Sequence, residues 1–135
     1  VELEDGHILM FMRDSNVSYM NMAESFDYGR TWNHIGNTDM PNGNSKITVE
    51  KVNGKVILVS NASATLGFDA RTNLQIQISD DNCKTWRKPI FVSSPEEHLF
   101  YPHIAVDYNK NLLYLAYENA KQQYLNVYTF EELGL

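Results

Sequence analysis

The feature that most constrains this chain is an eight-residue segment that occurs twice. Ser25–Trp32 reads SFDYGRTW, and Ser79–Trp86, 54 positions later, reads SDDNCKTW. A repeat at a fixed interval indicates that one structural unit is built more than once. In a tight turn the shared Asp can accept backbone N–H groups, the hydroxyl residues can add local hydrogen bonds, and the Trp ring can be buried below. The segments are therefore predicted to stabilise β-hairpins and not to catalyse a reaction.

The second copy departs from the first at one position. Cys83 stands where the first copy has Gly29. A turn of this kind favours a residue with positive φ, which Cys tolerates less well than Gly. Asn82, beside the cysteine, is a candidate for the left-handed conformation.

Three predicted hairpins lie about 50 residues apart and consist of an apolar strand, a turn and a second apolar strand. They are Val1–Arg13, Ile47–Ser60 and Ile104–Glu118. This interval is typical of the blades of a β-propeller. The sequence therefore predicts an all-β fold, a partial β-propeller of about two and a half four-stranded antiparallel blades. The expected units are residues 1–40, 45–94 and 100–130.

Some boundaries follow from local composition. We expect a short strand at Asn33–Ile35 to complete the first sheet, a polar loop at Gly36–Ser45, and a strand at Arg87–Val92 to complete the second sheet. Only Glu131–Leu135 has a pattern that allows a short helix. Because Val1–Leu3 reads as part of a strand, the chain is expected to be a piece of a longer protein. The open sheet edges would then be covered by the remaining blades or by self-association.

Composition narrows the class of protein. The net charge is −6 and Lys and Arg are scattered, so nucleic acid is not an expected partner. No apolar run has the length of a membrane span. Cys83 is the only cysteine, so no disulfide can form within the chain. The compartment stays open, and a secreted, cell-surface or periplasmic parent protein is compatible with the sequence. The four histidines lack ligand-like spacing, and we expect neither a metal nor a cofactor.

The repeated segments resemble the Asp-box, or bacterial neuraminidase repeat (BNR), of the sialidase superfamily. The resemblance extends over essentially the whole chain, and it implies a six-bladed propeller. Val1–Arg13 is similar to the hairpin that ends on the second arginine of the substrate-binding triad. Leu58–Asn61 with Arg71–Leu74 is similar to the segment of the third arginine. Phe100–Ile104 with Leu112–Glu118 is similar to the segment of the nucleophilic tyrosine, and its Tyr-Pro pair resembles the sialidase-like BNR repeat branch.

The resemblance implies that Arg13 and Arg71 bind the substrate carboxylate and that Tyr101 is the catalytic nucleophile. Guanidinium groups suit a sialic acid because they bind a carboxylate through two parallel hydrogen bonds. A neutral phenol can approach an anomeric carbon that carries a carboxylate more easily than an anionic side chain can, and sialidases are known for this tyrosine. Taken without the resemblance, the two arginines read as solvent-facing residues at strand ends and Tyr101 as a core tyrosine.

Further candidates resemble the asparagine-rich loops that line the pocket in the BNR branch. They are Asn42, Asn44, Ser45 and Asn61, and the alternative for each is ordinary turn chemistry. The resemblance also implies a glutamate that activates the tyrosine, a first arginine and an aspartic acid, all upstream of Val1. Glu118 is the nearest substitute for the glutamate, and we expect it to be structural. The chain alone is therefore expected to be inactive.

The sequence favours the last blades of an exo-α-sialidase, a glycoside hydrolase that removes terminal sialic acid with retention. The expected partner is a sialylated glycan. Two alternatives stay open. One is a glycosidase or lyase of the same fold that acts on another acidic sugar, and the other is a non-catalytic propeller that binds a glycan or a protein. All three depend on Arg13, Arg71 and Tyr101 pointing into one pocket.

Overall fold

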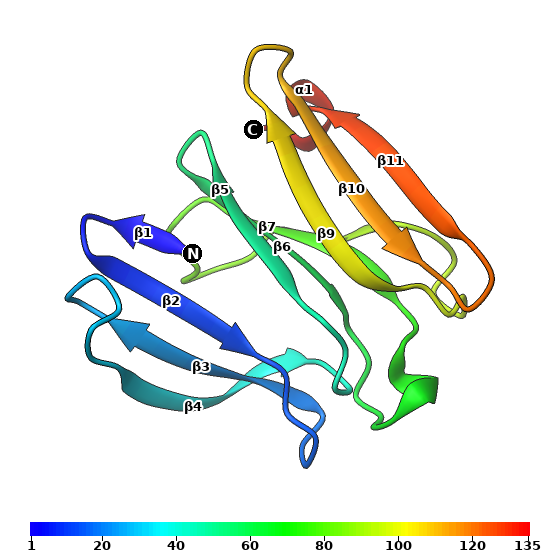
Figure 1. Cartoon of the computed structure of the whole chain (residues 1–135), viewed down its shortest axis with the longest axis horizontal. Coiled ribbons are helices and arrows are strands. Elements are labelled where there is room, and N and C mark those ends of the chain that lie inside the picture. Colours follow the sequence, from blue (N-terminus) through cyan, green and yellow to red (C-terminus); the bar gives the residue numbers. More distant parts are fainter.

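The computed structural model describes all residues, 1–135, and consists of three antiparallel β-sheets. Figure 1 shows the sheets next to one another in chain order. The first has the order β1-β2-β3-β4, the second β5-β6-β7-β8 and the third β11-β10-β9. The predicted all-β antiparallel fold is confirmed.

The bounds of the elements are as follows. The first sheet comprises β1 (Glu2–Glu4), β2 (His7–Met12), β3 (Tyr19–Ser25) and β4 (Asn33–Pro41). The second comprises β5 (Thr48–Val52), β6 (Lys55–Asn61), β7 (Leu74–Ser79) and β8 (Ile90–Phe91). The third comprises β9 (Phe100–Asp107), β10 (Leu112–Glu118) and β11 (Gln123–Thr129). A 3₁₀ turn, η1 (Phe68–Ala70), precedes β7, and α1 (Phe130–Leu133) follows β11. With four residues, α1 is too short to cross a membrane.

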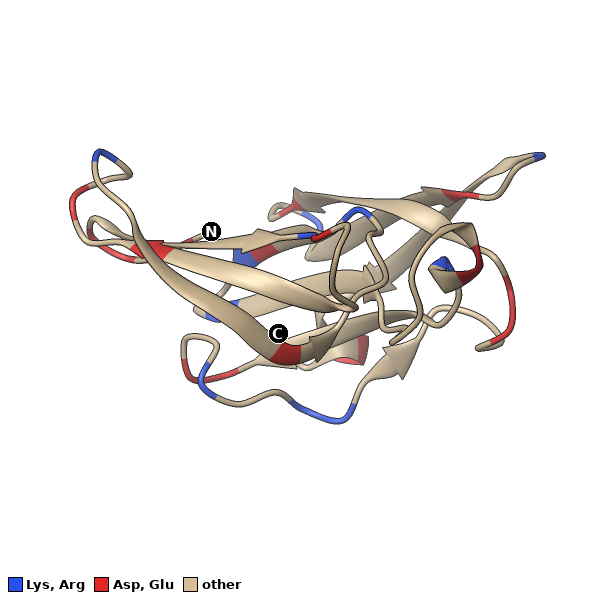
Figure 2. Cartoon of the chain, turned by 90° about the horizontal axis from the view of Figure 1, so that it is seen from below, with Lys and Arg blue, Asp and Glu red and all other residues tan.

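The main core lies between the second and third sheets. The central strand β6 is buried along most of its length, and Ile57 and Val59 on it pack in one cluster with Leu113 and Leu115 of β10. Phe130 and Leu133 of α1 close the cluster at one end. A smaller cluster of Leu3, Leu9 and Val56 joins the first sheet to the second. Figure 2 shows that Lys and Arg are scattered among the acidic residues and lie mostly outside the strands.

Both Asp-box segments form the predicted turn. Asp27 accepts hydrogen bonds from the Thr31 backbone N–H (2.8 Å) and hydroxyl (2.6 Å), and Asp81 accepts the same two bonds from Thr85. The Ser25 hydroxyl oxygen accepts the Gly29 N–H at 2.8 Å. The hydrogen bonds that the two ionised carboxylates accept, first of all those from Thr31 and Thr85, lower the pKa of Asp27 and of Asp81 from 3.8 to about 2.

Two details of the boxes differ from expectation. Cys83 itself takes positive φ (67°), together with Asn82 (57°), because the turn backbone follows the course of Tyr28 (60°) and Gly29 (80°). Trp32 is 38% exposed and not buried. Its indole N–H donates to the Gly29 carbonyl at 2.9 Å, which holds the ring against the turn at the open side of the first sheet. Trp86 is half-buried and lies edge-on to Phe11, with ring centroids 6.3 Å apart.

The expected loop at Gly36–Ser45 is largely wrong, because β4 continues to Pro41. The strand pairs with β3 through two irregularities, and Tyr19 lies opposite Pro41. An edge strand keeps one side free of sheet hydrogen bonds, so Gly and Pro are tolerated there and the apolar alternation that marks an inner strand is absent. The strand expected at Arg87–Val92 is shorter than predicted, because only Ile90–Phe91 (β8) pairs as a strand.

Candidate functional site

Arg71 lies at the end of η1, where its backbone N–H donates to the Phe68 carbonyl at 3.0 Å. This short turn aims the side chain at three aromatic rings. Its guanidinium carbon lies 5.4 Å from the centroid of Phe68, 5.0 Å from that of Phe100 and 4.8 Å from that of Tyr101. A guanidinium group is attracted to aromatic faces at such distances. The rings therefore fix the plane of the group without neutralising its charge.

Tyr101 occupies an unusual place in β9. Phe100 pairs with Glu118 and His103 with Ala116, so Tyr101 and Pro102 together face a single residue of β10. This arrangement is a β-bulge. Tyr101 has a φ of 56°, which is rare for a bulky residue. Such a backbone conformation persists only where the surrounding structure holds it in place. The bulge presents the ring edge-on to Phe100, at a centroid distance of 5.2 Å, with the side chain 38% exposed.

Arg13 follows β2 and is exposed. It lines a hollow of about 530 Å³ together with Tyr101 and Lys46, and the apolar remainder of the lining is Phe11, Met12 and Ile47. We call this space the Arg13 hollow. The structure thus brings Arg13 and Arg71 to Tyr101. Arg71 lies over the Tyr101 ring, and Arg13 and Tyr101 line the same hollow.

The cations at this site have no acidic partner. The ion pairs of the chain involve His7, Lys55, Arg87 and Lys110, and none involves Arg13, Lys46 or Arg71. The one polar contact of the Lys46 ammonium here is with Nδ1 of His103, at 3.4 Å. In a chain of net charge −6, the three cations near Tyr101 outnumber the one carboxylate beside it, that of Glu118, and make the region locally positive. Such a region suits an anionic ligand.

Ser45 and Asn61, expected to contact substrate, are both completely buried. The Ser45 hydroxyl donates to the Asn61 side-chain oxygen at 2.6 Å. The Asn61 amide then donates to the carbonyls of Thr72 at 3.0 Å and Leu99 at 2.7 Å. In this geometry both side chains hold backbone in place and do not face solvent. Because Thr72 follows Arg71 and Leu99 shortly precedes Tyr101, they position the two site residues.

The Asn42–Asn44 segment forms a tight turn against the loop that carries Arg71. Asn42 is buried and its side-chain oxygen accepts the Ser45 N–H at 3.0 Å. A Cβ on Gly43 would lie 1.9 Å from the Thr65 carbonyl oxygen and 2.1 Å from the Ala70 Cβ, so only glycine fits. Asn44 takes positive φ (66°), as turn chemistry favours, and is half-buried.

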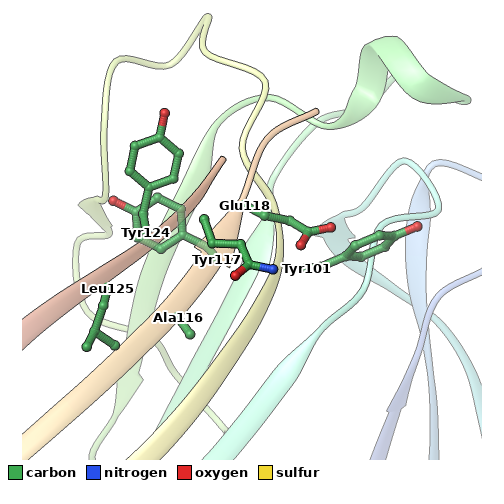
Figure 3. Close-up of a pocket in the computed structure, with 7 residues that line it drawn as sticks. Tyr101, Ala116, Tyr117, Glu118, Tyr124 and Leu125 are labelled. Carbon is green, nitrogen blue, oxygen red and sulfur yellow. The ribbon is translucent and has the colours of Figure 1, made fainter. Parts of the chain in front are cut away.

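Glu118 lies beside Tyr101 in a second hollow, of about 470 Å³, on the open face of the third sheet. Figure 3 shows its carboxylate near the base of the tyrosine ring, while the phenol oxygen points away from the other labelled residues. The Tyr101 hydroxyl makes no hydrogen bond within the chain, to Glu118 or to any other residue. Glu118 is therefore not placed as the base of that phenol.

Three residues of this site were not singled out from the sequence. Lys46 adjoins the candidate Ser45, but its contact with His103 joins segments far apart in the chain. Phe68 stands three residues before Arg71 in a short turn, which is a usable local signal for a stacked pair. Phe100 directly precedes Tyr101 and is buried.

The family profile of the BNR repeat-like domain matches residues 1–114. The chain belongs to the BNR repeat-like domain family. The matched range includes Arg13, Arg71 and Tyr101, and both repeated segments. No curated protein matches the chain. Membership in the BNR repeat-like family agrees with the three antiparallel sheets and is consistent with a sialidase-like protein, without fixing a substrate or a reaction.

Proposed function

We propose that this BNR repeat-like chain forms the last blades, about two and a half, of a six-bladed sialidase-like propeller. The parent protein would be an exo-α-sialidase that releases terminal sialic acid with retention of configuration. Arg13 and Arg71 would bind the carboxylate of the sugar, and Tyr101 would attack its anomeric carbon. The observation that supports this most is that Arg71 lies against the Tyr101 ring without any carboxylate partner.

The chemistry of the site agrees with a carboxylate on the reacting carbon. The two guanidinium groups stay charged at any physiological pH and can bind a carboxylate through paired N–H donors. A phenol as the attacking group, unlike a carboxylate, does not place a second anion next to the substrate carboxylate. Lys46 adds a second positive charge to the Arg13 hollow, beside that of Arg13.

Attack by a phenol requires removal of its proton, and this chain holds no carboxylate bonded to the Tyr101 oxygen. This observation favours a second candidate function for the chain by itself, the binding of an acidic glycan without turnover. A glycosidase or lyase for another acidic sugar on the same scaffold would use the same two arginines.

Binding by the chain tests the common part of these functions. The α-methyl glycoside of N-acetylneuraminic acid should shift the NMR resonances of Arg13, Arg71 and Tyr101. Arg13→Ala and Arg71→Ala should weaken this binding, while Tyr101→Phe should leave it nearly unchanged. The methyl ester of the same sugar is the matched control, because it lacks the negative charge. If the ester binds as well as the acid, the proposed carboxylate site is wrong.

Turnover separates the enzyme from the binding protein. In a longer protein that contains this chain, Tyr101→Phe should abolish release of a fluorogenic sialoside while binding is kept. Unchanged turnover in that variant would eliminate Tyr101 as the nucleophile. A wild-type protein that binds the sialoside and never releases the fluorophore would support the non-catalytic function.

A further inference from the structure

A second pocket lies on the other side of Phe100 from Tyr101. It has a volume of about 490 Å³ and opens between the loop before β9 and the turn between β10 and β11. Phe68, His98, Phe100, Tyr117 and Tyr124 supply its aromatic lining. We call it the aromatic pocket. Its size lies within the range of small-molecule binding sites.

The aromatic side chains of this pocket form two stacked pairs. Phe68 and His98 are nearly parallel, with an interplanar angle of 11° and centroids 5.5 Å apart. Tyr117 and Tyr124 are also parallel, at 13° and 5.2 Å. Phe68 is 54% exposed and His98 is exposed as well. A contiguous exposed apolar patch with a polar rim marks an interaction site or a ligand-binding groove.

The rim of the aromatic pocket is polar and electrically balanced. Glu97 and Lys121 each line it, and neither forms an ion pair. The Tyr124 oxygen accepts hydrogen bonds from the side-chain amides of Asn119 at 2.9 Å and Gln122 at 2.6 Å. Its own O–H has no acceptor in the chain and is free to donate. Donors and acceptors around aromatic faces, without excess charge, suit a neutral polyhydroxylated ring.

The two sites share a wall. Phe100 lines the aromatic pocket and lies 5.0 Å from the Arg71 guanidinium carbon, while Phe68 contacts the same group at 5.4 Å. A ligand unit in the aromatic pocket would thus be next to one held by Arg71 and Tyr101. We propose that the aromatic pocket binds the neutral pyranose that adjoins the acidic sugar in the same glycan. The presence of an acidic sugar next to the pocket rests on the proposed function. The choice of a neutral sugar rests on the lining of the aromatic pocket itself.

The test uses lactose as a probe, because it supplies neutral pyranoses without a carboxylate. Lactose should shift the NMR resonances of Phe68, His98 and Tyr124. His98→Ala and Tyr124→Leu should each weaken lactose binding by roughly fivefold or more, since one stacked aromatic contact contributes about 1 kcal/mol. Tyr108→Leu is the matched control, since Tyr108 is 56% exposed at the turn between β9 and β10.

The second arm uses 3′-sialyllactose. Its affinity should exceed that of the methyl sialoside by roughly fivefold or more, and His98→Ala should remove this gain. Equal affinities of wild type, His98→Ala and Tyr124→Leu for lactose and for sialyllactose would overturn the inference. His98 makes no hydrogen bond or ion pair, so its variant keeps the test valid if Tyr124→Leu fails to fold.

The two proposals fail in different ways. If Arg13→Ala and Arg71→Ala do not affect binding of the acidic sugar, the proposed function is wrong, whatever lactose does. Lactose binding that depends on His98 and Tyr124 would still support a neutral-sugar pocket in that case. If the acidic sugar binds as proposed but His98→Ala and Tyr124→Leu leave the lactose affinity unchanged, only the neutral-sugar pocket is rejected.

Discussion

The guanidinium carbon of Arg71 lies 4.8 Å from the centroid of the Tyr101 ring. Two further rings hold the group in place, so its plane is fixed before any ligand arrives. A lysine would keep the charge but lose both the stacked plane and the paired N–H donors. This difference leads to the first prediction.

Arg71→Lys should weaken binding of the methyl sialoside about tenfold, which corresponds to about 1.4 kcal/mol, and Arg71→Ala should weaken it further. NMR titration or calorimetry measures both affinities. Arg30→Ala is the control, because Arg30 is exposed in the first Asp-box segment, outside the site. An affinity of Arg71→Lys equal to that of wild type would show that charge alone accounts for binding.

Asn61→Ala should lower the free energy of unfolding by ~2–3 kcal/mol. The substitution leaves the buried Ser45 hydroxyl and the carbonyls of Thr72 and Leu99 without their hydrogen-bond partner. Urea denaturation measures the change. Asn16→Ala, at an exposed asparagine, should have little effect. A loss no larger than that of Asn16→Ala would contradict the structural role assigned to Asn61.

Asp27→Asn should destabilise the fold at neutral pH and not at about pH 2. The pKa of Asp27 is lowered from 3.8 to about 2 by hydrogen bonds from Thr31 and Ser25. Ionised Asp27 therefore adds stability that is complete above about pH 4 and lost as the pH falls through about 2. The difference in Tm between wild type and variant, followed from pH 6 to pH 2, should shrink toward zero. Asp39→Asn, at an exposed aspartate without an ion pair, is the control over the same pH range.

Cys83 should react slowly with iodoacetamide in the folded protein. Burial raises the pKa of its thiol from 9.0 to about 11, so little reactive thiolate is present at pH 7.5. Unfolding in urea should increase the alkylation rate strongly. By the same linkage, the protonated thiol is favoured in the folded state, and stability should decline as the pH rises above about 9. Equal rates in folded and unfolded protein would contradict this.

The outer edge of β11 should pair with another strand. No residue of Gln123–Thr129 is charged, and Leu125 (61%) and Val127 (49%) are exposed. An uncharged seven-residue edge of this kind is a template for strand addition. We expect the chain alone to self-associate with rising concentration, as light scattering would measure. Val127→Lys should reduce this, and a chain that stays monomeric at every concentration would refute the expectation.

The sequence allowed the strands and the Asp-box turns to be predicted because both depend on local patterns. The hydrogen bonds from Thr31 to Asp27 span four residues, and the alternation in β7 marks a strand without outside information. The strand expected at Asn33–Ile35 is the start of the edge strand β4, but its continuation to Pro41 was not predicted, because the polar residues there carry no such pattern. Positive φ at Cys83 was missed because the turn imposes it on whichever residue stands there.

Site residues were accessible to sequence reasoning only where a resemblance marked their position. Arg13, Arg71 and Tyr101 were named in this way. The burial of Ser45 and Asn61 depends on a hydrogen bond across 16 positions, and the contact between Lys46 and His103 spans 57. No local pattern encodes such pairs, because the packing of separate sheets brings them together.

Each sheet of the molecule contributes one residue to the site, since Arg13 follows β2, Arg71 precedes β7 and Tyr101 belongs to β9. A sugar bound to all three would link the three sheets at one point, in addition to the two apolar clusters between them. Occupancy would then raise the melting temperature and slow amide exchange in strands that never contact the sugar.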